Sequence, residues 1–374
     1  MVTGVRQQGA IQFAVMSISR LVLLTSLSMA WVAGEPLRVA IAGLTHGHAE
    51  GFFRSLRGRN DVRVVGVYEP DTELQKRYAE RHGLAQEVLF TDLAAMLDKV
   101  KPEAVAAFSS TYDHPAVVEA CAARKIPMMM EKPLAVSVDH AMRIQRAAAR
   151  SGIPVIVNYE TTWYRSHSAI KKLVDQGELG PIRKVVAMDG HQGPKEIGVG
   201  PEFFGWLTDP VKNGAGALFD FGCYGANLMT WLMENARPIA VTAMTQQIKP
   251  EIYAKVDDEA TILVEYPKAQ AIIEASWNWP FNRKDLEVYG QKGQAIAVGG
   301  NTLRVRLPGK NAEENMTPAE LPEAERDSVS YLTAIARGTL KPGGLSSLEN
   351  NLIVTEILAA ARESARSGRR VVLK

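Results

Sequence analysis

The sequence has 374 residues, which is enough for two domains of ordinary size. Hydrophobic residues make up 46% of the chain and charged residues 22%, an ordinary globular composition that excludes a disordered or membrane-embedded protein. The formal net charge of +2, without any run of like charges, leaves no basic excess for a nucleic-acid backbone, so we expect no nucleic-acid partner.

The first 34 residues are the exception to this composition. Arg20 precedes a short apolar run over residues 21–30, and small residues follow at Ala33 and Gly34. This layout is typical of a secretory signal peptide, because the run is too short to span a membrane comfortably. We predict that residues 1–34 are a signal peptide and that the mature protein is periplasmic or secreted, without a stable membrane span. A cytoplasmic protein with a disordered or tethering tail is the alternative.

Residues 35–157 alternate short apolar strands with helical patterns. A strand opens this region at Arg38, and further strands are predicted over residues 62–68, 104–108, 127–130 and 154–157. Short strands that alternate with helices imply parallel β-α-β units. We therefore predict an α/β fold that begins with a Rossmann-type domain over residues 35–157.

Beyond Tyr159 the pattern changes. Helices are predicted over residues 168–176, 214–233 and 347–367, and strands over residues 182–188, 241–248, 260–266, 271–277 and 286–289. Helices followed by a run of strands suggest a mostly antiparallel sheet backed by helices. We predict that residues 158–374 form an α+β domain with a mostly antiparallel open sheet.

The turn after the first strand is a partial match to the three-glycine fingerprint of dinucleotide sites. Gly43 stands at the first glycine position, Thr45 at the second and His48 at the third. A β-branched Thr45 either pushes the phosphates outward or fills their site. Glu69, about 26 residues beyond Gly43, is placed to accept a hydrogen bond from a ribose 2′-OH, and no arginine follows it. A nicotinamide cofactor bound here would be NAD rather than NADP.

His46 and His48 form a His-x-His pair in the same turn. A zinc site needs further ligands, and the only two cysteines, Cys121 and Cys223, do not supply them at a suitable spacing. The two cysteines also exclude a disulfide framework. We predict no metal and expect the histidines to contact a phosphate or to fill space.

The run over residues 128–135 reads Met-Met-Met-Glu-Lys-Pro-Leu-Ala. An apolar strand that ends in a charged pair and a proline places Glu131 and Lys132 at its carboxyl end, where ligands bind in open α/β sheets. A surface ion pair after a strand is the alternative.

These stretches, together with residues 214–224, resemble in order and spacing the glucose-fructose oxidoreductase, inositol dehydrogenase and rhizopine-catabolism (Gfo/Idh/MocA) family, from about Leu37 to Lys374. The resemblance implies an NAD(P)-dependent oxidoreductase with a Rossmann domain and a second, substrate-binding domain. It also implies that Ser109, Thr111 and His114 lie along the cofactor, although only His114 keeps the family's residue type. A helix cap is the alternative for the hydroxyls.

The resemblance also assigns the chemistry. Lys132 would hydrogen-bond both the substrate and the nicotinamide ribose, Pro133 would follow a cis bond, and Tyr224 stands where many relatives carry histidine. A phenol has an ordinary pKa near 10 and needs a neighbouring cation to work near neutral pH, which we expect Lys132 to provide. We interpret Asp220 as orienting the substrate or Tyr224. A buried aromatic on a helix face is the alternative for Tyr224.

Substrate contacts are expected from the second domain. The candidates share an aromatic or polar side chain that suits a sugar, although each also fits ordinary structure: Tyr159, Tyr164, Arg165, His191 and Asn213. The resemblance implies an oxidoreductase that acts on a secondary hydroxyl of a sugar. The alternatives are a glycoside hydrolase that keeps NAD bound, as some relatives do, and a non-catalytic sugar-binding protein. Relatives commonly pair through the second domain's sheet, so we expect a homo-oligomer.

Overall fold

The structure is a computed structural model that describes residues 35–373. The predicted signal peptide, residues 1–34, lies outside the described residues. None of the helices within residues 35–373 is both long and apolar enough to cross a membrane.

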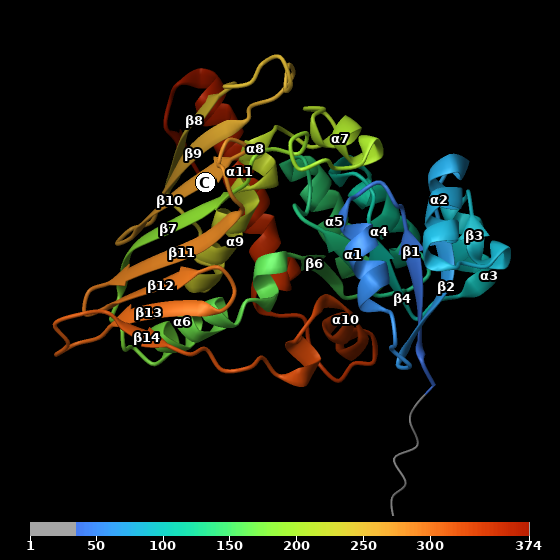
Figure 1. Cartoon of the computed structure of the whole chain (residues 1–374), viewed down its shortest axis with the longest axis horizontal. Coiled ribbons are helices and arrows are strands. Elements are labelled where there is room, and N and C mark those ends of the chain that lie inside the picture. Colours follow the sequence, from blue (N-terminus) through green and yellow to red (C-terminus); the bar gives the residue numbers. More distant parts are fainter. Residues whose placement is uncertain (1–34, 374) are drawn as a thin grey trace, which may run out of the picture. The chain divides into compact units, whose positions relative to one another are not determined.

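The first sheet has six parallel strands in the order β3-β2-β1-β4-β5-β6 (Figure 1). Its strands are β1 (Leu37–Ala42), β2 (Val62–Tyr68), β3 (Leu89–Phe90), β4 (Ala104–Ala107), β5 (Met128–Glu131) and β6 (Val155–Asn158). β4, near the centre of the sheet, is apolar throughout because both of its faces are covered, and all of its residues are buried. The predicted Rossmann fold is confirmed. The two-residue β3 was not predicted, because it is too short to show a pattern.

Helices cover both faces of this sheet. They are α1 (His48–Ser55), α2 (Thr72–His82), α3 (Leu93–Val100), α4 (His114–Ala122) and α5 (Val138–Ser151). α5 shows why these segments are helical: Ser137 accepts a hydrogen bond from the His140 N–H at its start, and Gly152 ends it with φ of 72°. Its buried residues recur at helical spacing, from Ala141 through Ile144 to Ala148. Strand order reverses between β1 and β4, and ligands bind at such a reversal.

One helix from the distant end of the chain completes the first domain. α10 (Ser328–Ala336) packs Val329, Leu332 and Ile335 into the same apolar cluster as Phe52 of α1 and Ile41 of β1. The sequence pattern assigned every residue after 157 to the second domain. α10 nevertheless shares the core of the first sheet, which sequence periodicity cannot reveal.

The second sheet has nine strands in the order β14-β13-β12-β11-β7-β10-β9-β8-β15. Its strands are β7 (Ile182–Gly190), β8 (Ala240–Gln246), β9 (Glu259–Glu265), β10 (Gln270–Ser276), β11 (Arg283–Gly290), β12 (Gln294–Val298), β13 (Thr302–Arg306), β14 (Glu314–Met316) and β15 (Val371–Val372). Only the pair of β7 and β10 is parallel. The predicted mostly antiparallel sheet is therefore confirmed, although β12 to β14 were not predicted.

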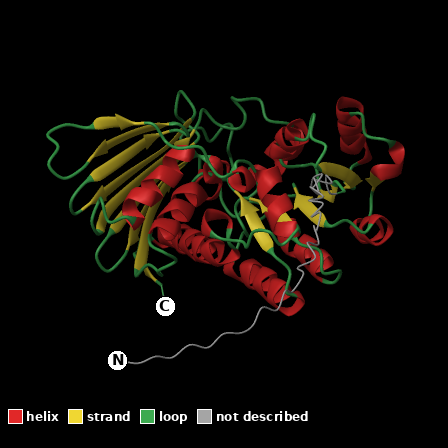
Figure 2. Ribbon diagram, turned by 90° about the horizontal axis from the view of Figure 1, so that it is seen from below, coloured by secondary structure: helices red, strands yellow, loops and turns green. Residues whose placement is uncertain are grey.

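Helices cover one face of the second sheet (Figure 2). They include α6 (Arg165–Asp175), α8 (Ala217–Asp220), α9 (Gly222–Leu232) and α11 (Leu348–Ser367), and the short α7 (Pro201–Leu207) lies outside the sheet. α9 packs on β7 and β10, while α11 contacts β8 as well as α5 of the first domain. No helix within residues 35–373 covers the other face of the sheet (Figure 2). This face carries exposed Met244, Leu263 and Val298.

The long helix predicted from Gly214 to Met233 is wrong in its first part. Gly214 has φ of 95°, which a right-handed helix excludes. The N–H groups of Gly216 and Leu218 donate to the Asp257 carboxylate, so the helix begins only at Ala217, and it breaks at Phe221.

Candidate active site

The turn between β1 and α1 is held in a shape that requires glycine. Gly43 has φ of 88°, and a Cβ there would lie 2.9 Å from the Ser109 backbone. Its N–H donates to the Tyr68 carbonyl at 2.8 Å, and the His46 N–H donates to the Phe108 carbonyl at 2.9 Å. The turn is thus tied to the ends of β2 and β4, as expected of the first glycine in a dinucleotide fingerprint.

Glu69 lies at the end of β2 with its carboxylate turned towards this turn. One oxygen accepts the Leu44 N–H at 2.8 Å and the other accepts the Asp71 N–H at 3.0 Å. Burial raises the pKa of Glu69, and these two hydrogen bonds oppose the rise. Each carboxylate oxygen accepts more than one hydrogen bond, so Glu69 can still bind a ribose hydroxyl.

The segment after β4 buries Ser109, Thr111 and His114. None of the hydroxyls caps α4, so the capping alternative is not supported. His114 Nδ1 lies 3.0 Å from the Leu134 carbonyl, and burial lowers the pKa of its ring. Three buried atoms here have no hydrogen-bond partner within residues 35–373: His46 Nε2, Thr111 Oγ1 and His114 Nε2.

Buried polar atoms without partners are uncommon in native proteins and call for an explanation. These three lie at the carboxyl ends of β1 and β4, where the strand order reverses. A bound dinucleotide offers polar groups to such atoms at this place. The residues present therefore fit a dinucleotide, with Gly43 forming the turn and Glu69 facing it from β2.

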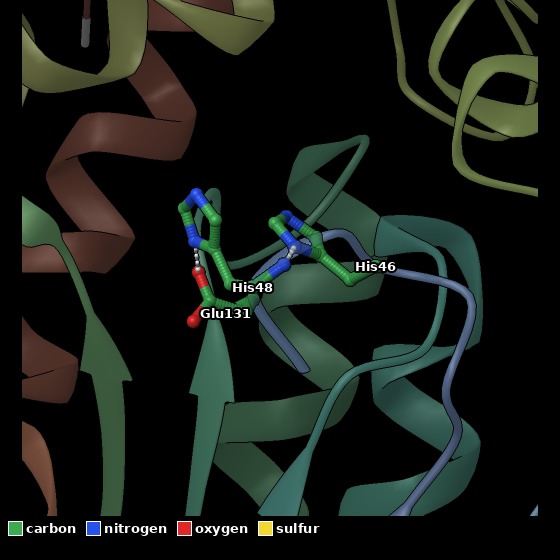
Figure 3. Close-up of side chains that lie close together, drawn as sticks. All are labelled: His46, His48 and Glu131. Atoms are coloured by element: carbon green, nitrogen blue, oxygen red, sulfur yellow. Dashed lines mark hydrogen bonds and ion pairs between the residues drawn. The ribbon is translucent and has the colours of Figure 1, made fainter. Parts of the chain in front are cut away.

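His46, His48 and Glu131 form a cluster at the end of β5 (Figure 3). His48 Nδ1 lies 2.9 Å from Glu131 Oε2, and the His48 N–H donates to His46 Nδ1 at 3.1 Å. Asn158 donates to the second Glu131 oxygen at 2.7 Å, and Trp163 donates to Asn158 at 3.1 Å. His48, Asn158 and Lys132 hold the pKa of Glu131 below its usual value against the effect of its burial.

The three side chains of this cluster lie within 4.8 Å of one another, close enough to be considered for a metal ion. Both Glu131 oxygens and one nitrogen of each histidine already take part in the hydrogen bonds described above. The absence of a metal stays a prediction. The His46 ring also packs against the tilted ring of Phe203 of α7, with 4.6 Å between the ring centroids, which is compatible with the space-filling role expected for it.

The centre of the site is a buried ion pair between Lys132, which follows β5 of the first sheet, and Asp220 of α8. Lys132 Nζ lies 2.5 Å from Asp220 Oδ1, and Trp277 Nε1 donates to the other Asp220 oxygen at 3.0 Å. Burial would lower the pKa of Lys132 and raise that of Asp220, but each group holds the other in its charged form. The Lys132–Pro133 bond is cis, as the resemblance implied.

Tyr224 lies beside this pair and is itself buried. The ammonium groups of Lys132 and Lys284 lie 5.1 Å and 5.0 Å from the centre of its ring. Burial raises the pKa of Tyr224 well above its usual value. Lys132 thus lies beside the ring while its ammonium is paired with Asp220, and its role as the cation that assists Tyr224 stays a prediction.

Two charged residues of this region were missed by the sequence reading. Lys284 of β11 forms an ion pair with Glu160, and it stands opposite Asp189 of β7 in the strand register. Asp189 is 1% exposed, and neither of its oxygens has a hydrogen-bond partner in the described part of the chain. Burial raises the pKa of Asp189 well above its usual range, against the pull of Lys284. Asp189 and Lys284 are far apart in the chain and belong to no sequence motif. Only the pairing of β7 with β11 brings them together.

We expect Asp189→Asn to stabilise the protein increasingly as the pH rises. In the unfolded chain Asp189 loses its proton near pH 3.8, whereas the folded protein retains it to higher pH. The unfolded state then binds fewer protons at Asp189, so wild type loses about 1.4 kcal/mol of stability per pH unit relative to the Asn variant, until Asp189 ionises in the folded state. Chemical denaturation at several pH values between 4 and 7 measures the difference.

The exposed Asp139→Asn is the matched control, and its effect should not change with pH in this way. A constant difference between wild type and Asp189→Asn across this range would contradict the buried, proton-retaining state of Asp189.

Three of the predicted substrate residues lie near this centre. Tyr159 packs edge-to-face on Tyr224 at 5.4 Å, and the Tyr164 hydroxyl donates to Glu160 at 2.6 Å. The ring centroids of His191 and Phe221 lie 4.8 Å apart, and Phe221 directly follows Asp220 in the chain.

The other two candidates have structural partners. Arg165 bonds Asn301 and Glu320. Asn213 is fully buried and donates to the Ala215 carbonyl at 2.7 Å, which shapes the turn before α8.

A cavity of about 400 Å³ opens at the ends of β4, β5 and β6. Its polar and aromatic lining includes His48, Glu131, Asn158, Glu160 and Trp163. Amide, carboxylate and indole groups together suit a polyhydroxylated ligand, and Glu160 connects this cavity to Lys284 and therefore to Tyr224.

Comparison with known proteins identifies the family to which the chain belongs. Residues 37–159 match the oxidoreductase family with an NAD-binding Rossmann fold, and residues 167–296 match the GFO/IDH/MocA C-terminal domain. The chain therefore belongs to the Gfo/Idh/MocA oxidoreductase family, and its first domain is an NAD-binding Rossmann domain.

Individual relatives agree along nearly the whole chain. D-apiose dehydrogenase of Rhizobium rhizogenes is 24% identical over 340 residues, which cover 86% of this chain and 94% of the relative. An inositol dehydrogenase homologue of Azotobacter vinelandii, solved with NAD+, has a TM-score of 0.78 at 18% identity and covers 91% of this chain and 98% of its own. Aldose-aldose oxidoreductase of Caulobacter crescentus, solved with glycerol, has a TM-score of 0.76 at 22% identity. The match covers 90% of this chain and 100% of the oxidoreductase chain.

Proposed function

We propose that the protein is an NAD-dependent oxidoreductase that acts on a secondary hydroxyl of a sugar or sugar derivative. The observation that carries this proposal is the buried Lys132–Asp220 pair beside Tyr224, next to an NAD-binding Rossmann domain. A relative named D-apiose dehydrogenase and an inositol dehydrogenase homologue support a polyhydroxylated substrate. The polar cavity beside Glu131 offers room for it.

Each residue of the centre has a role in this proposal. NAD supplies the acceptor for the hydride. Lys132 donates a hydrogen bond to the oxygen of the reacting carbon. Asp220 keeps the Lys132 ammonium charged and holds it in this orientation. Trp277 fixes the Asp220 carboxylate. Tyr224 takes the hydroxyl proton during oxidation and returns it during reduction.

The choice of NAD over NADP follows from Glu69. A carboxylate at the end of β2 accepts hydrogen bonds from the two ribose hydroxyls of NAD, whereas a 2′-phosphate would meet like charge there. The Leu44 and Asp71 N–H groups orient the Glu69 carboxylate for this contact.

The direct test is to incubate the purified mature chain with NAD and a panel of aldoses, polyols and glycosides and to follow the absorbance of the reduced nicotinamide. Mass spectrometry of ligands released by denaturation shows in parallel whether NAD is retained. We expect reduction of NAD by at least one polyol class. Failure to bind NAD, with binding of a sugar intact, would favour the non-catalytic alternative.

One observation favours a second candidate, a glycoside hydrolase that oxidises its sugar transiently and keeps NAD bound. Phe203 and Trp206 of α7 lie on the dinucleotide turn, with ring contacts of 4.6 Å and 5.6 Å to His46, and this cover would slow cofactor exchange. Such an enzyme turns over without added NAD, so glycoside cleavage by the protein as purified would distinguish it.

We also propose that the protein is exported and that it forms a homo-oligomer. The apolar run after Arg20 supports cleavage of residues 1–34 and a periplasmic or secreted protein. The uncovered face of the nine-stranded sheet, with exposed Met244 and Leu263, supports a homo-oligomer formed through that face.

A further inference from the structure

A short segment from the second domain's part of the sequence crosses the dinucleotide turn. We call residues 201–212, which comprise α7 and the turn after it, the strap. Phe203 lies so close to Gly47 that a Cβ there would be 3.2 Å from its ring. Trp206 Nε1 donates to the Thr45 carbonyl at 3.3 Å. The strap is therefore attached to the turn that follows β1.

The strap is also attached to the neighbouring strands' loops. The Tyr112 N–H, in the segment after β4, donates to the Lys212 carbonyl at 3.1 Å. On the other side, Arg77 of α2 donates to Glu202 of α7 at 3.0 Å. The strap thus contacts the turn after β1, the segment after β4 and helix α2, which follows β2, and the loops after these strands form the dinucleotide site of a Rossmann domain.

Glu202 brings a second carboxylate to the β2 side of this site. Burial is the main cause of the raised pKa of Glu69, and the negative charge of Glu202 raises it further by a smaller amount. Arg77, the partner of Glu202, is half-exposed on α2. The next arginine on the same helix, Arg81, is bound to Glu50 at 3.1 Å. Both arginines of α2 are therefore occupied by carboxylates of other elements.

The difference between the two nicotinamide cofactors lies at this end of the site. NADP carries a 2′-phosphate where NAD has a hydroxyl, and an arginine near the end of β2 is the usual partner of that phosphate. A carboxylate that binds this arginine leaves the 2′-phosphate without its partner. The carboxylate also repels the phosphate, and the Coulomb energy between two such charges is appreciable near a protein surface.

We propose that Glu202 is a second specificity-determining residue, which works with Glu69 to exclude NADP by binding Arg77. The inference rests on the proposed NAD-dependent function and extends it to a residue of the strap. It explains how a segment far from Glu69 in sequence contributes to cofactor choice, and it assigns the ion pair between α2 and α7 a role beyond fixing α7.

The test is titration calorimetry of the cofactor-free protein with NAD and with NADP. Glu202→Gln keeps the side chain's length and removes its charge. We expect its affinity for NADP to rise about tenfold, because Arg77 becomes available to the phosphate, while its affinity for NAD changes less than about threefold. Adding Arg77→Met to Glu202→Gln should remove the gain for NADP.

Glu196→Gln is the matched control. Glu196 lies just before the strap and also forms an ion pair, with Lys249 at 2.5 Å, so its loss should leave both affinities unchanged. An equal change of both affinities in Glu202→Gln, or a gain that persists without Arg77, would overturn the inference while leaving the NAD-dependent function intact. Binding of neither dinucleotide to wild type or to any variant would overturn both.

Discussion

Lys132→Met should abolish turnover and also destabilise the protein. The substitution removes the ammonium that we propose to contact the reacting oxygen, which should lower the rate by about 10²- to 10³-fold or more. It also leaves the buried Asp220 carboxylate without its counter-charge, which costs about 3–5 kcal/mol of unfolding free energy. The sequence motif does not reveal this cost in stability, because Asp220 lies 88 residues away from Lys132 in the chain.

The two effects can be separated with a double variant. Lys132→Met combined with Asp220→Asn removes both charges, so most of the stability should return while turnover stays absent. Urea denaturation at neutral pH is suitable, because the pair stabilises the protein from above the usual pKa of Asp220, 3.8, to beyond that of Lys132, 10.5. Rates near those of wild type in the double variant would contradict the catalytic role of Lys132.

The parts of the fold that could be predicted from sequence are those with local signals. β5 is an apolar run that ends in Glu131 and Lys132, and its place at the edge of the ligand site follows from the general geometry of open α/β sheets. Gly43 likewise marks a turn with positive φ. The strands of the second sheet alternate buried and exposed residues, as in β9, and this alternation is readable in the sequence.

The parts that could not be predicted depend on contacts between distant segments. Asp189 and Lys284 are opposite each other only because β7 pairs with β11, and single-sequence periodicity does not specify that register. α10 looks like any other apolar helix, and only tertiary packing assigns it to the first sheet. The strap has no sequence motif either, since its role arises from contacts with the turn after β1.

The partner of Asp220 shows the same limit within the site. Asp220 and Tyr224 are four residues apart, a spacing that places two side chains on one face of a continuous helix. In the structure the helix breaks at Phe221, and Asp220 bonds Lys132 and Trp277. The sequence identified the residues of the centre, while the pairing among them required the structure.

Tyr224→Phe should lower the rate of sugar oxidation by about 10²- to 10⁴-fold with little change in stability. The phenyl ring retains the edge-to-face contact with Tyr159 and the position near Lys132 and Lys284, and only the hydroxyl is lost. Tyr266→Phe is the matched control, because it removes a hydroxyl from a buried ring that has no role in the site. Steady-state rates and thermal unfolding of both variants measure the two effects.

The pH dependence tests the proton-transfer role of Tyr224 itself. Burial raises the pKa of Tyr224 above 10, so its hydroxyl keeps its proton throughout the neutral range. Oxidation needs the deprotonated form, whose fraction grows about tenfold per pH unit below the pKa, and the oxidation rate of wild type should rise with pH accordingly. Reduction uses the protonated form and should stay constant over the same range. If Tyr224→Phe kept the rise with pH, another group would have to accept the proton, and Tyr224 would serve only to pack the site.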